Sequence, residues 1–141
     1  TNLEFKKYIG IDIVEELIEL NRKNFANKNI SFECINLVDG KLPKVDLIFS
    51  RDCFVHLSYL NTLKIIKHFK HSGSKYLLTT TFTNNINNVN LEKRFWRPLN
   101  MQLPPFNFPT PLNIINEGCT EGNGMFSDKS LGLWLFKDIH C

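Results

Sequence analysis

The feature that most constrains how this sequence can fold is the alternation of apolar and amphipathic segments along residues 6–82. Strand-like segments lie at residues 6–12, 30–35, 45–50 and 75–82, and the one at residues 45–50 is nearly continuously apolar. Amphipathic segments, in which apolar residues recur on one helical face, lie at residues 13–26 and 59–71. Apolar strands separated by helices are typical of a parallel sheet covered on both faces. The sequence therefore predicts an α/β fold with a mostly parallel sheet.

Both predicted helices carry signals at their ends. In the first, acidic residues occupy the first turn and basic residues lie near the end, as the helix dipole favours. In the second, we expect Ser58 to be the N-cap and Gly73 to end the helix. The apolar residues expected to face the core are Val14, Leu17, Ile18 and Phe25 in the first helix, and Leu60, Leu63, Ile66 and Phe69 in the second.

The second half of the chain has a different character. Residues 83–111 contain five prolines among aromatic residues, which predicts a long loop. The aromatic residues favour an ordered loop over a disordered one. Two more strands are predicted at residues 112–118 and 130–139, and the short glycine-rich link between them predicts an antiparallel pair. With 141 residues, the chain is expected to form a single domain, residues 1–141.

The composition and charge argue against several classes of protein. The chain is 43% hydrophobic and 22% charged, which is ordinary for a soluble globular protein. Its net charge of +3 is small and its lysines are scattered, so a nucleic-acid surface is not indicated. No apolar run reaches the ~18 to 20 residues of a membrane span, and no signal peptide is visible, so we expect a cytoplasmic protein.

The four cysteines form no CxxC pair and have no regular spacing. This pattern argues against a zinc knuckle and against a disulfide scaffold, and no metal is expected. Cys34 and Cys53 lie in apolar segments, where we expect reduced and buried thiols.

The residues directly after the predicted strands are the candidates for a binding site, because ligands of open α/β sheets lie at the carboxyl ends of strands. Asp12, Asn36 and residues 50–54 hold such positions. Asp12 has two interpretations that do not exclude each other. Its carboxylate could accept both hydroxyls of a ribose, or it could cap the following helix, with Glu15 at the capping-box spacing.

The motifs follow one another in a recognisable order. A strand ending in GID, a helix, a strand ending in CINL, and an apolar strand leading into SRDCFVHLS are followed by a helix, a strand and a terminal antiparallel pair. This order, from about Lys7 to Ile139, resembles the class I S-adenosylmethionine-dependent methyltransferases. SRDCFVHLS together with WRPLNMQLPPFNFPTPLNIINEGCTEG is similar to an uncharacterised subgroup of that family. The resemblance implies a Rossmann-like sheet, mostly parallel with a C-terminal antiparallel strand pair, and S-adenosylmethionine as cofactor.

The resemblance also implies roles for five residues. Asp12, with Ile13 beside it, matches the acid that holds the cofactor ribose. Asn36, with Leu37 beside it, matches the residue that faces the adenine amino group, where the family more often has Asp. Arg51 follows the strand whose end lines the methionine part of the cofactor and the mouth of the substrate site.

The sequence departs from the family pattern at its start. The family begins with a strand and a glycine-rich loop, whereas only seven residues precede Tyr8. In the family strand order, 3-2-1-4-5-7-6, that first strand lies in the middle of the sheet. We therefore expect the sheet to form two pieces with unpaired apolar edges, and the cofactor affinity to be below normal.

Asp52 and His56 are the candidate catalytic residues, since they lie four positions apart near the expected mouth of the site. Either could orient or deprotonate a nucleophilic oxygen or nitrogen, and histidine has the more suitable pKa. The alternatives are structural: Asp52 pairs with Arg51 or caps backbone amides, and His56 merely leads into a helix.

Trp96, Arg97 and Phe106 are the candidate substrate-binding residues in the long loop. As parts of a lid, the two aromatic residues would supply apolar walls and Arg97 an anion contact. The alternative is that the aromatic residues of this loop close the end of the core. Trp134, on the last predicted strand, is expected to lie in the core.

The leading interpretation is S-adenosylmethionine-dependent methyl transfer to an unknown, small-molecule or sugar-like acceptor. A noncatalytic remnant or interaction domain with the same fold is the alternative. An NAD-dependent Rossmann oxidoreductase is a third interpretation, and the terminal antiparallel strand pair argues against it. The expected partner is a small molecule, rather than nucleic acid or a membrane, and assembly with a second copy of the chain stays open.

Overall fold

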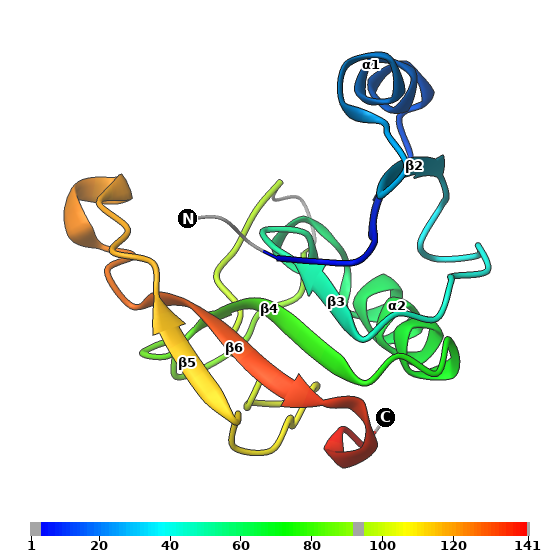
Figure 1. The fold of residues 1–141 in the computed structure, drawn as a ribbon. Helices are drawn as coiled ribbons and strands as arrows, with labels where there is room; N and C mark the ends of the chain where they lie inside the picture. The colour runs from blue at the N-terminus through cyan, green and yellow to red at the C-terminus, as the bar shows by residue number, and fades with distance from the viewer. Residues whose placement is uncertain (1–3, 92–94, 141) are drawn as a thin grey trace. The chain divides into compact units, whose positions relative to one another are not determined.

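The computed structural model of the chain describes residues 4–91 and 95–140 and divides the chain into two compact units. The first unit is Thr1–Leu42 and the second is Pro43–Cys141 (Figure 1). The organisation of residues 1–141 as a single domain stays a prediction. Within the described residues, no helix is long and apolar enough to cross a membrane.

The first unit consists of two parallel strands joined by a helix. Its elements are β1 (Tyr8–Asp12), α1 (Glu15–Phe25) and β2 (Ile30–Cys34). The register pairs Tyr8 with Ile30 and Asp12 with Cys34, so the carboxyl ends of both strands lie side by side. The strand predictions for this unit are confirmed, and the helix begins two residues later than predicted.

Two burial predictions for the first unit are wrong. Ile18 is the one buried residue of α1, whereas Val14, Leu17 and Phe25 are each between 42% and 58% exposed. The physical reason is that α1 packs on a sheet of only two strands, which can cover one narrow ridge of the helix. Cys34, expected to be buried, is exposed and directs its thiol toward the carbonyl of Ile13.

The second unit contains a four-stranded sheet. Its regular elements are β3 (Leu47–Ser50), η1 (Phe54–His56), α2 (Tyr59–His71), β4 (Tyr76–Phe82), β5 (Asn113–Asn116), η2 (Glu121–Gly124), β6 (Lys129–Leu135) and η3 (Phe136–Asp138). The strand order is β3-β4-β6-β5, in which β3 is parallel to β4 and β6 is antiparallel to both of its neighbours. The antiparallel pairing of the two C-terminal strands is thus confirmed.

Helix α2 has the bounds that the sequence predicts, because both of its end signals form. The hydroxyl of Ser58 accepts a hydrogen bond of 3.2 Å from the amide of Asn61, and Gly73 adopts a left-handed φ of 76° just after the helix. The inward face is rotated from the predicted one: Leu60 is 64% exposed, and the buried residues are Thr62, Ile65, Ile66 and Phe69.

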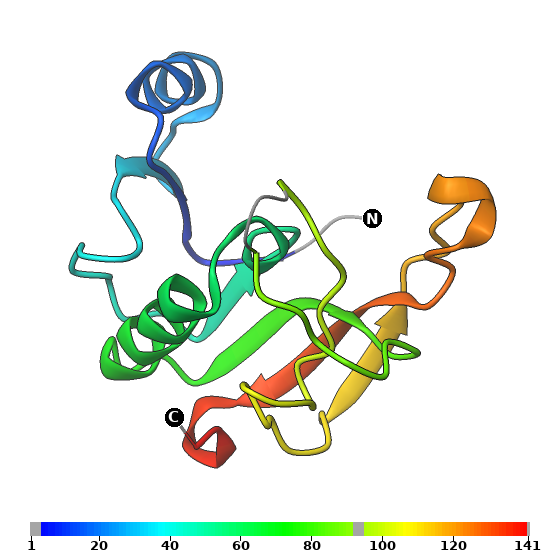
Figure 2. The same cartoon turned by 180° about the vertical axis from the view of Figure 1, so that it is seen from behind.

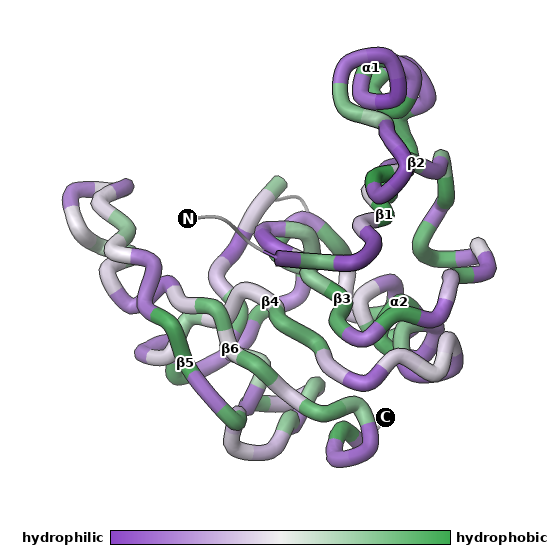
Figure 3. The backbone as a smooth tube through the Cα atoms, viewed as in Figure 1, coloured by the Kyte–Doolittle hydropathy of each residue, from purple (hydrophilic) through white to green (hydrophobic). Residues whose placement is uncertain are grey.

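The hydrophobic core of the second unit lies on one face of its sheet. Helix α2 and the long loop after β4 both lie on this face (Figure 2). The loop contributes Leu99, Met101, Phe106 and Phe108, all at most 4% exposed. Trp134 on β6 is also in this core, as predicted, and its indole donates to the carbonyl of Pro109. Hydrophobic stretches along β4 and β6 stand out when the chain is coloured by hydropathy (Figure 3).

The strands form two separate sheets. β1 and β2 pair with each other, and β3 pairs only with β4, so one edge of β1 and one edge of β3 have no partner strand within the described residues. The pairs follow the family order with its first strand left out. The expectation of a sheet in two pieces is therefore confirmed.

Candidate functional site

Candidate residues of the first unit gather where β1 and β2 end. The amide of Ile35 donates to the carbonyl of Asp12, which fixes the two strand ends against each other. Asp12 is the last residue of β1, and its Oδ1 accepts a hydrogen bond of 2.9 Å from the amide of Val14. The N-cap of α1 is Val14, so the capping-box arrangement of Asp12 and Glu15 is wrong. Asp12 instead stabilises the turn that leads into the helix.

Asn36 also holds a turn. Its Oδ1 accepts a hydrogen bond of 3.0 Å from the amide of Val38, and its Nδ2 donates to Asp39 over 3.3 Å. The neighbouring candidates differ in exposure, because Ile13 is 63% exposed whereas Leu37 is half-buried. The structure thus places polar and apolar groups together at these strand ends.

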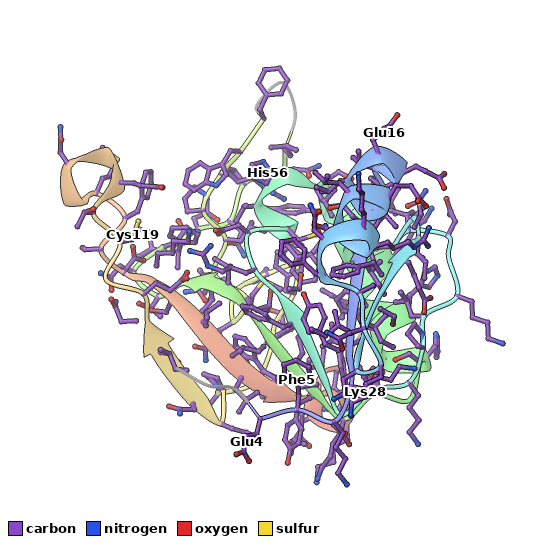
Figure 4. All side chains as sticks on the ribbon, turned by 45° about the horizontal axis from the view of Figure 1, so that its top comes forward. Glu4, Phe5, Glu16, Lys28, His56 and Cys119 are labelled. Carbon is purple, nitrogen blue, oxygen red and sulfur yellow. The ribbon has the colours of Figure 1, made fainter. Side chains whose placement is uncertain are left out.

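The second unit has a pocket of about 310 Å³ where β3 and β4 end and β6 begins. Its charged or titratable lining residues are Arg51, Asp52, His56, Glu121 and Lys129, and its aromatic ones are Phe82, Trp96 and Phe126. Figure 4 shows His56 on the turn that follows β3. Three of the residues predicted to be catalytic or substrate-binding, Asp52, His56 and Trp96, are therefore brought together.

The three aromatic residues of the pocket form one continuous wall. Their rings meet edge to face, with centroids 5.8 Å apart for Phe82 and Trp96, 6.0 Å for Phe82 and Phe126, and 4.9 Å for Trp96 and Phe126. Edge-to-face contacts of this kind stabilise the arrangement beyond the burial of apolar area. The wall is consequently apolar and held together by its own ring contacts.

The charged residues at the pocket form a closed ring of alternating sign, which we call the charge ring: Arg51, Asp52, Lys129 and Glu117. Lys129 Nζ lies 2.7 Å from Asp52 and 3.9 Å from Glu117. Arg51 lies 2.6 Å from Glu117 and 3.6 Å from Asp52. The hydrogen bond to Glu117 raises the pKa of Arg51. Each cation therefore faces both carboxylates.

Asp52 has a backbone conformation that side chains other than glycine rarely adopt, with φ at 53°. Its amide donates a hydrogen bond of 2.8 Å to Thr80 Oγ1 on β4, and its carboxylate is held by Lys129. Backbone strain of this kind persists only where surrounding contacts enforce it, and it is common at functional sites.

One ring nitrogen of His56 is bound to the backbone. Nδ1 lies 2.8 Å from the carbonyl oxygen of Phe95. Because a carbonyl only accepts, Nδ1 carries the proton in this contact, and the neutral ring then has its free lone pair on Nε2. His56 is exposed, so Nε2 is accessible to a molecule in the pocket.

Comparison with known proteins identifies the fold. No protein-family model matches the sequence, and no curated protein matches it significantly. The methyltransferase domain of the bacterial protein CtHen1-CN superposes with a TM-score of 0.61 at 14% identity, over 93% of this chain and 78% of that one. A protein from Listeria monocytogenes, named a putative S-adenosylmethionine-dependent methyltransferase, gives a TM-score of 0.56 at 10% identity, over 92% of this chain and 80% of that one.

This chain has the fold of the class I S-adenosylmethionine-dependent methyltransferases. Magnesium protoporphyrin IX methyltransferase (ChlM) from Synechocystis PCC 6803, with bound SAH, aligns at 18% identity with a TM-score of 0.44. That match covers 55% of this chain and 37% of the enzyme, so this chain spans well under half of its length.

Two residues that were predicted to bind substrate lie in the core of the second unit. Arg97 and Phe106 are each 1% exposed. The guanidinium of Arg97 donates to the carbonyls of Phe54, Leu57 and Val89, and burial lowers its pKa. The prediction that Arg97 contacts an anion is therefore wrong, and so is the prediction that Phe106 forms an apolar wall of the substrate site. Arg97 instead holds the turn η1 that carries His56.

Sequence reasoning missed Glu117 and Lys129. They follow β5 and begin β6, and the antiparallel course of β6 brings its amino end to the edge where β3 and β4 end. The predicted antiparallel pair could have indicated these two residues, because an antiparallel last strand places its first residues at the edge where the parallel strands end. Within residues 4–91 and 95–140, no group of His, Cys, Asp and Glu could hold a metal ion.

Proposed function

We propose that this chain takes part in S-adenosylmethionine-dependent methyl transfer to a small molecule held in the pocket of the second unit. The observation that carries the proposal is the placement of His56. Its Nδ1 is fixed on the carbonyl of Phe95, and its Nε2 is accessible in a pocket at the carboxyl ends of strands. Ligands of open α/β sheets bind at this edge.

Asp12 and Asn36 are the residues of the first unit that would hold the cofactor. The hydrogen bonds of Asp12 within the described residues use Oδ1, so Oδ2 is available to a ribose hydroxyl. The side-chain carbonyl of Asn36 accepts from Val38 and retains a second lone pair for an amino group. Ile13 and Leu37 would supply apolar contacts beside them. When bound, S-adenosylmethionine supplies an electrophilic methyl group on a sulfonium.

His56 is proposed to accept the proton of the acceptor. A hydroxyl or amine is a better nucleophile once it shares its proton with a base, and a neutral imidazole is suited to this near neutral pH. Asp52 is bound to Lys129 at 2.7 Å, so we assign it to orienting the acceptor rather than to proton transfer. Alignment of the reacting groups supplies much of the remaining rate enhancement of methyl transfer.

Arg51 is assigned to the acceptor pocket rather than to the cofactor. Its guanidinium lines the pocket and is tied to Glu117, a residue of the same unit. A cytoplasmic location and assembly with a second copy of the chain stay predictions.

The test of the proposal is calorimetric titration of the chain with S-adenosylhomocysteine. We expect binding by the natural sequence and about tenfold weaker binding by Asp12→Asn, which keeps an oxygen for the amide of Val14 but removes the charge offered to the ribose. The matched control is Glu16→Gln, an exposed residue of α1 (Figure 4). Absence of binding by the natural sequence would favour the alternative, a noncatalytic domain with a methyltransferase fold.

A further inference from the structure

The charge ring leaves the floor of the pocket without net charge. Arg51 and Lys129 each contact both Asp52 and Glu117, so two positive and two negative groups cancel within a few ångströms. Glu121 adds one further carboxylate to the lining. The lining thus holds two cations, Arg51 and Lys129, and two carboxylates, Asp52 and Glu121, so a charged ligand would face like charges whichever sign it carried.

The charge ring nevertheless keeps hydrogen-bonding capacity. Lys129 donates one hydrogen bond, to Asp52, and its 3.9 Å contact with Glu117 is too long for a second. Arg51 binds Glu117 through Nε, whereas its Nη1 lies 3.6 Å from Asp52. Within the described residues, N–H donors of both cations thus stay available, and Asp52 Oδ1 has only a 3.4 Å contact with Thr80.

Hydroxyl groups match this combination. A hydroxyl donates one hydrogen bond and accepts two without carrying charge, so it can accept from Lys129 or Arg51 and donate to Asp52. A carboxylate or phosphate could only accept, and an ammonium could only donate. Neighbouring hydroxyls on a cyclic ligand could accept from the cations and donate to the carboxylates of the charge ring at the same time.

The aromatic wall offers a packing surface for the apolar part of such a ligand. Trp96 and Phe126 present apolar surface next to the charged floor, and the C–H faces of a saturated ring pack on surface of that kind. The pocket volume of about 310 Å³ is at the small end for ligand sites. One ring of six atoms with its substituents fits these limits.

We infer that the pocket binds an uncharged ring carrying several hydroxyl groups, a sugar or cyclitol unit, and discriminates against charged rings of the same size. This inference rests on the proposed function, because it names the acceptor class of the same pocket. It depends on the charge ring being closed, and that dependence makes it testable apart from catalysis.

The experiment is a nuclear magnetic resonance titration of the full chain with three matched probes: methyl α-glucopyranoside, glucuronate and glucosamine. They share one ring and differ in charge. The readout is the indole N–H signal of Trp96, assigned with a Trp96→Phe variant and compared with the signal of the buried Trp134. We expect the neutral probe to shift the Trp96 signal, and both charged probes to bind about tenfold more weakly.

Two variants separate charge from shape. Glu121→Gln removes a carboxylate from the lining, and Glu117→Gln opens the charge ring and gives it a net positive charge. Both should improve glucuronate binding relative to the neutral probe by several-fold, and the exposed Glu16→Gln should not. If Glu117→Gln fails to fold, Glu121→Gln alone decides, because its side chain is exposed.

Equal or tighter binding of glucuronate by the natural sequence would overturn the inference, and so would the absence of any shift of Trp96 with the neutral probe. The titration needs no cofactor, so the two proposals can fail separately. Loss of S-adenosylhomocysteine binding with intact binding of the neutral probe contradicts the proposed function alone. The reverse result contradicts the acceptor class alone.

Discussion

Lys129 donates a hydrogen bond of 2.7 Å to the carboxylate of Asp52, although 77 positions separate the two residues in the sequence. The bond ties the start of β6 to the turn after β3, across the intervening strand β4. Lys129 is only 9% exposed, so its ammonium depends on this partner. The contact therefore serves both the stability of the second unit and the shape of its pocket.

Replacing this lysine should be costly. We expect Lys129→Met to lower the free energy of unfolding by about 2 kcal/mol, because Asp52 loses its hydrogen-bonded partner while remaining partly buried. Urea denaturation measures the change. Lys137→Met, at an exposed position of η3, is the control and should change stability by about 0.5 kcal/mol or less. Equal effects of the two variants would show that the ion pair contributes nothing.

The left-handed backbone of Asp52 gives a second prediction. Asn tolerates this conformation whereas Ala does not, and both remove the charge. We expect Asp52→Ala to be about 1 kcal/mol less stable than Asp52→Asn, the difference reflecting backbone strain. Thermal denaturation of the two variants side by side checks this. A more stable Ala variant would mean that the residue leaves the left-handed region at no cost.

Even a conservative replacement of Arg97 should destabilise the fold. Lys cannot reproduce the planar fork that reaches the carbonyls of Phe54, Leu57 and Val89 together. We expect Arg97→Lys to lower the free energy of unfolding by about 3 kcal/mol. Arg22→Lys, whose side chain is 41% exposed, is the matched control and should cost less than about 1 kcal/mol. The idea fails if the two losses are alike.

Tyr59 should make stability depend on alkaline pH. Burial raises its pKa above the ordinary value of 10.0. The unfolded chain then loses this proton first, so the contribution of Tyr59 is complete below about pH 10 and is lost as the pH rises through the folded-state pKa. We expect the natural sequence to lose stability relative to Tyr59→Phe above about pH 10, as measured by urea denaturation. A constant difference between them from about pH 8 to about pH 11 would contradict the assignment.

Local signals account for the elements that were predicted well. Ser58 and Gly73 lie at the two ends of α2, and each acts on backbone groups within a few positions of itself. Such contacts form wherever the local sequence allows them, which explains the agreement at both ends of α2. The face that α2 buries depends on what packs against it. Leu60 was consequently misplaced.

Burial in the long loop was harder to predict for a similar reason. Arg97 stands in a segment that reads as a loop, and nothing near it in sequence indicates that its guanidinium would be enclosed. Its partners are carbonyls 43, 40 and 8 positions away. Phe106 had a stated alternative in the core, and the structure bears that alternative out.

The sequence by itself determined the alternation of strands and helices, the antiparallel C-terminal pair, and the polar residues Asp12, Asn36 and Asp52 at the carboxyl ends of strands. These features follow from periodicity and from contacts within a few residues. Only the tertiary structure decided which charges meet. Arg51 with Glu117 and Asp52 with Lys129 are pairs formed across 66 and 77 positions, because the order of strands in the sheet, rather than the distance along the chain, brings their ends together.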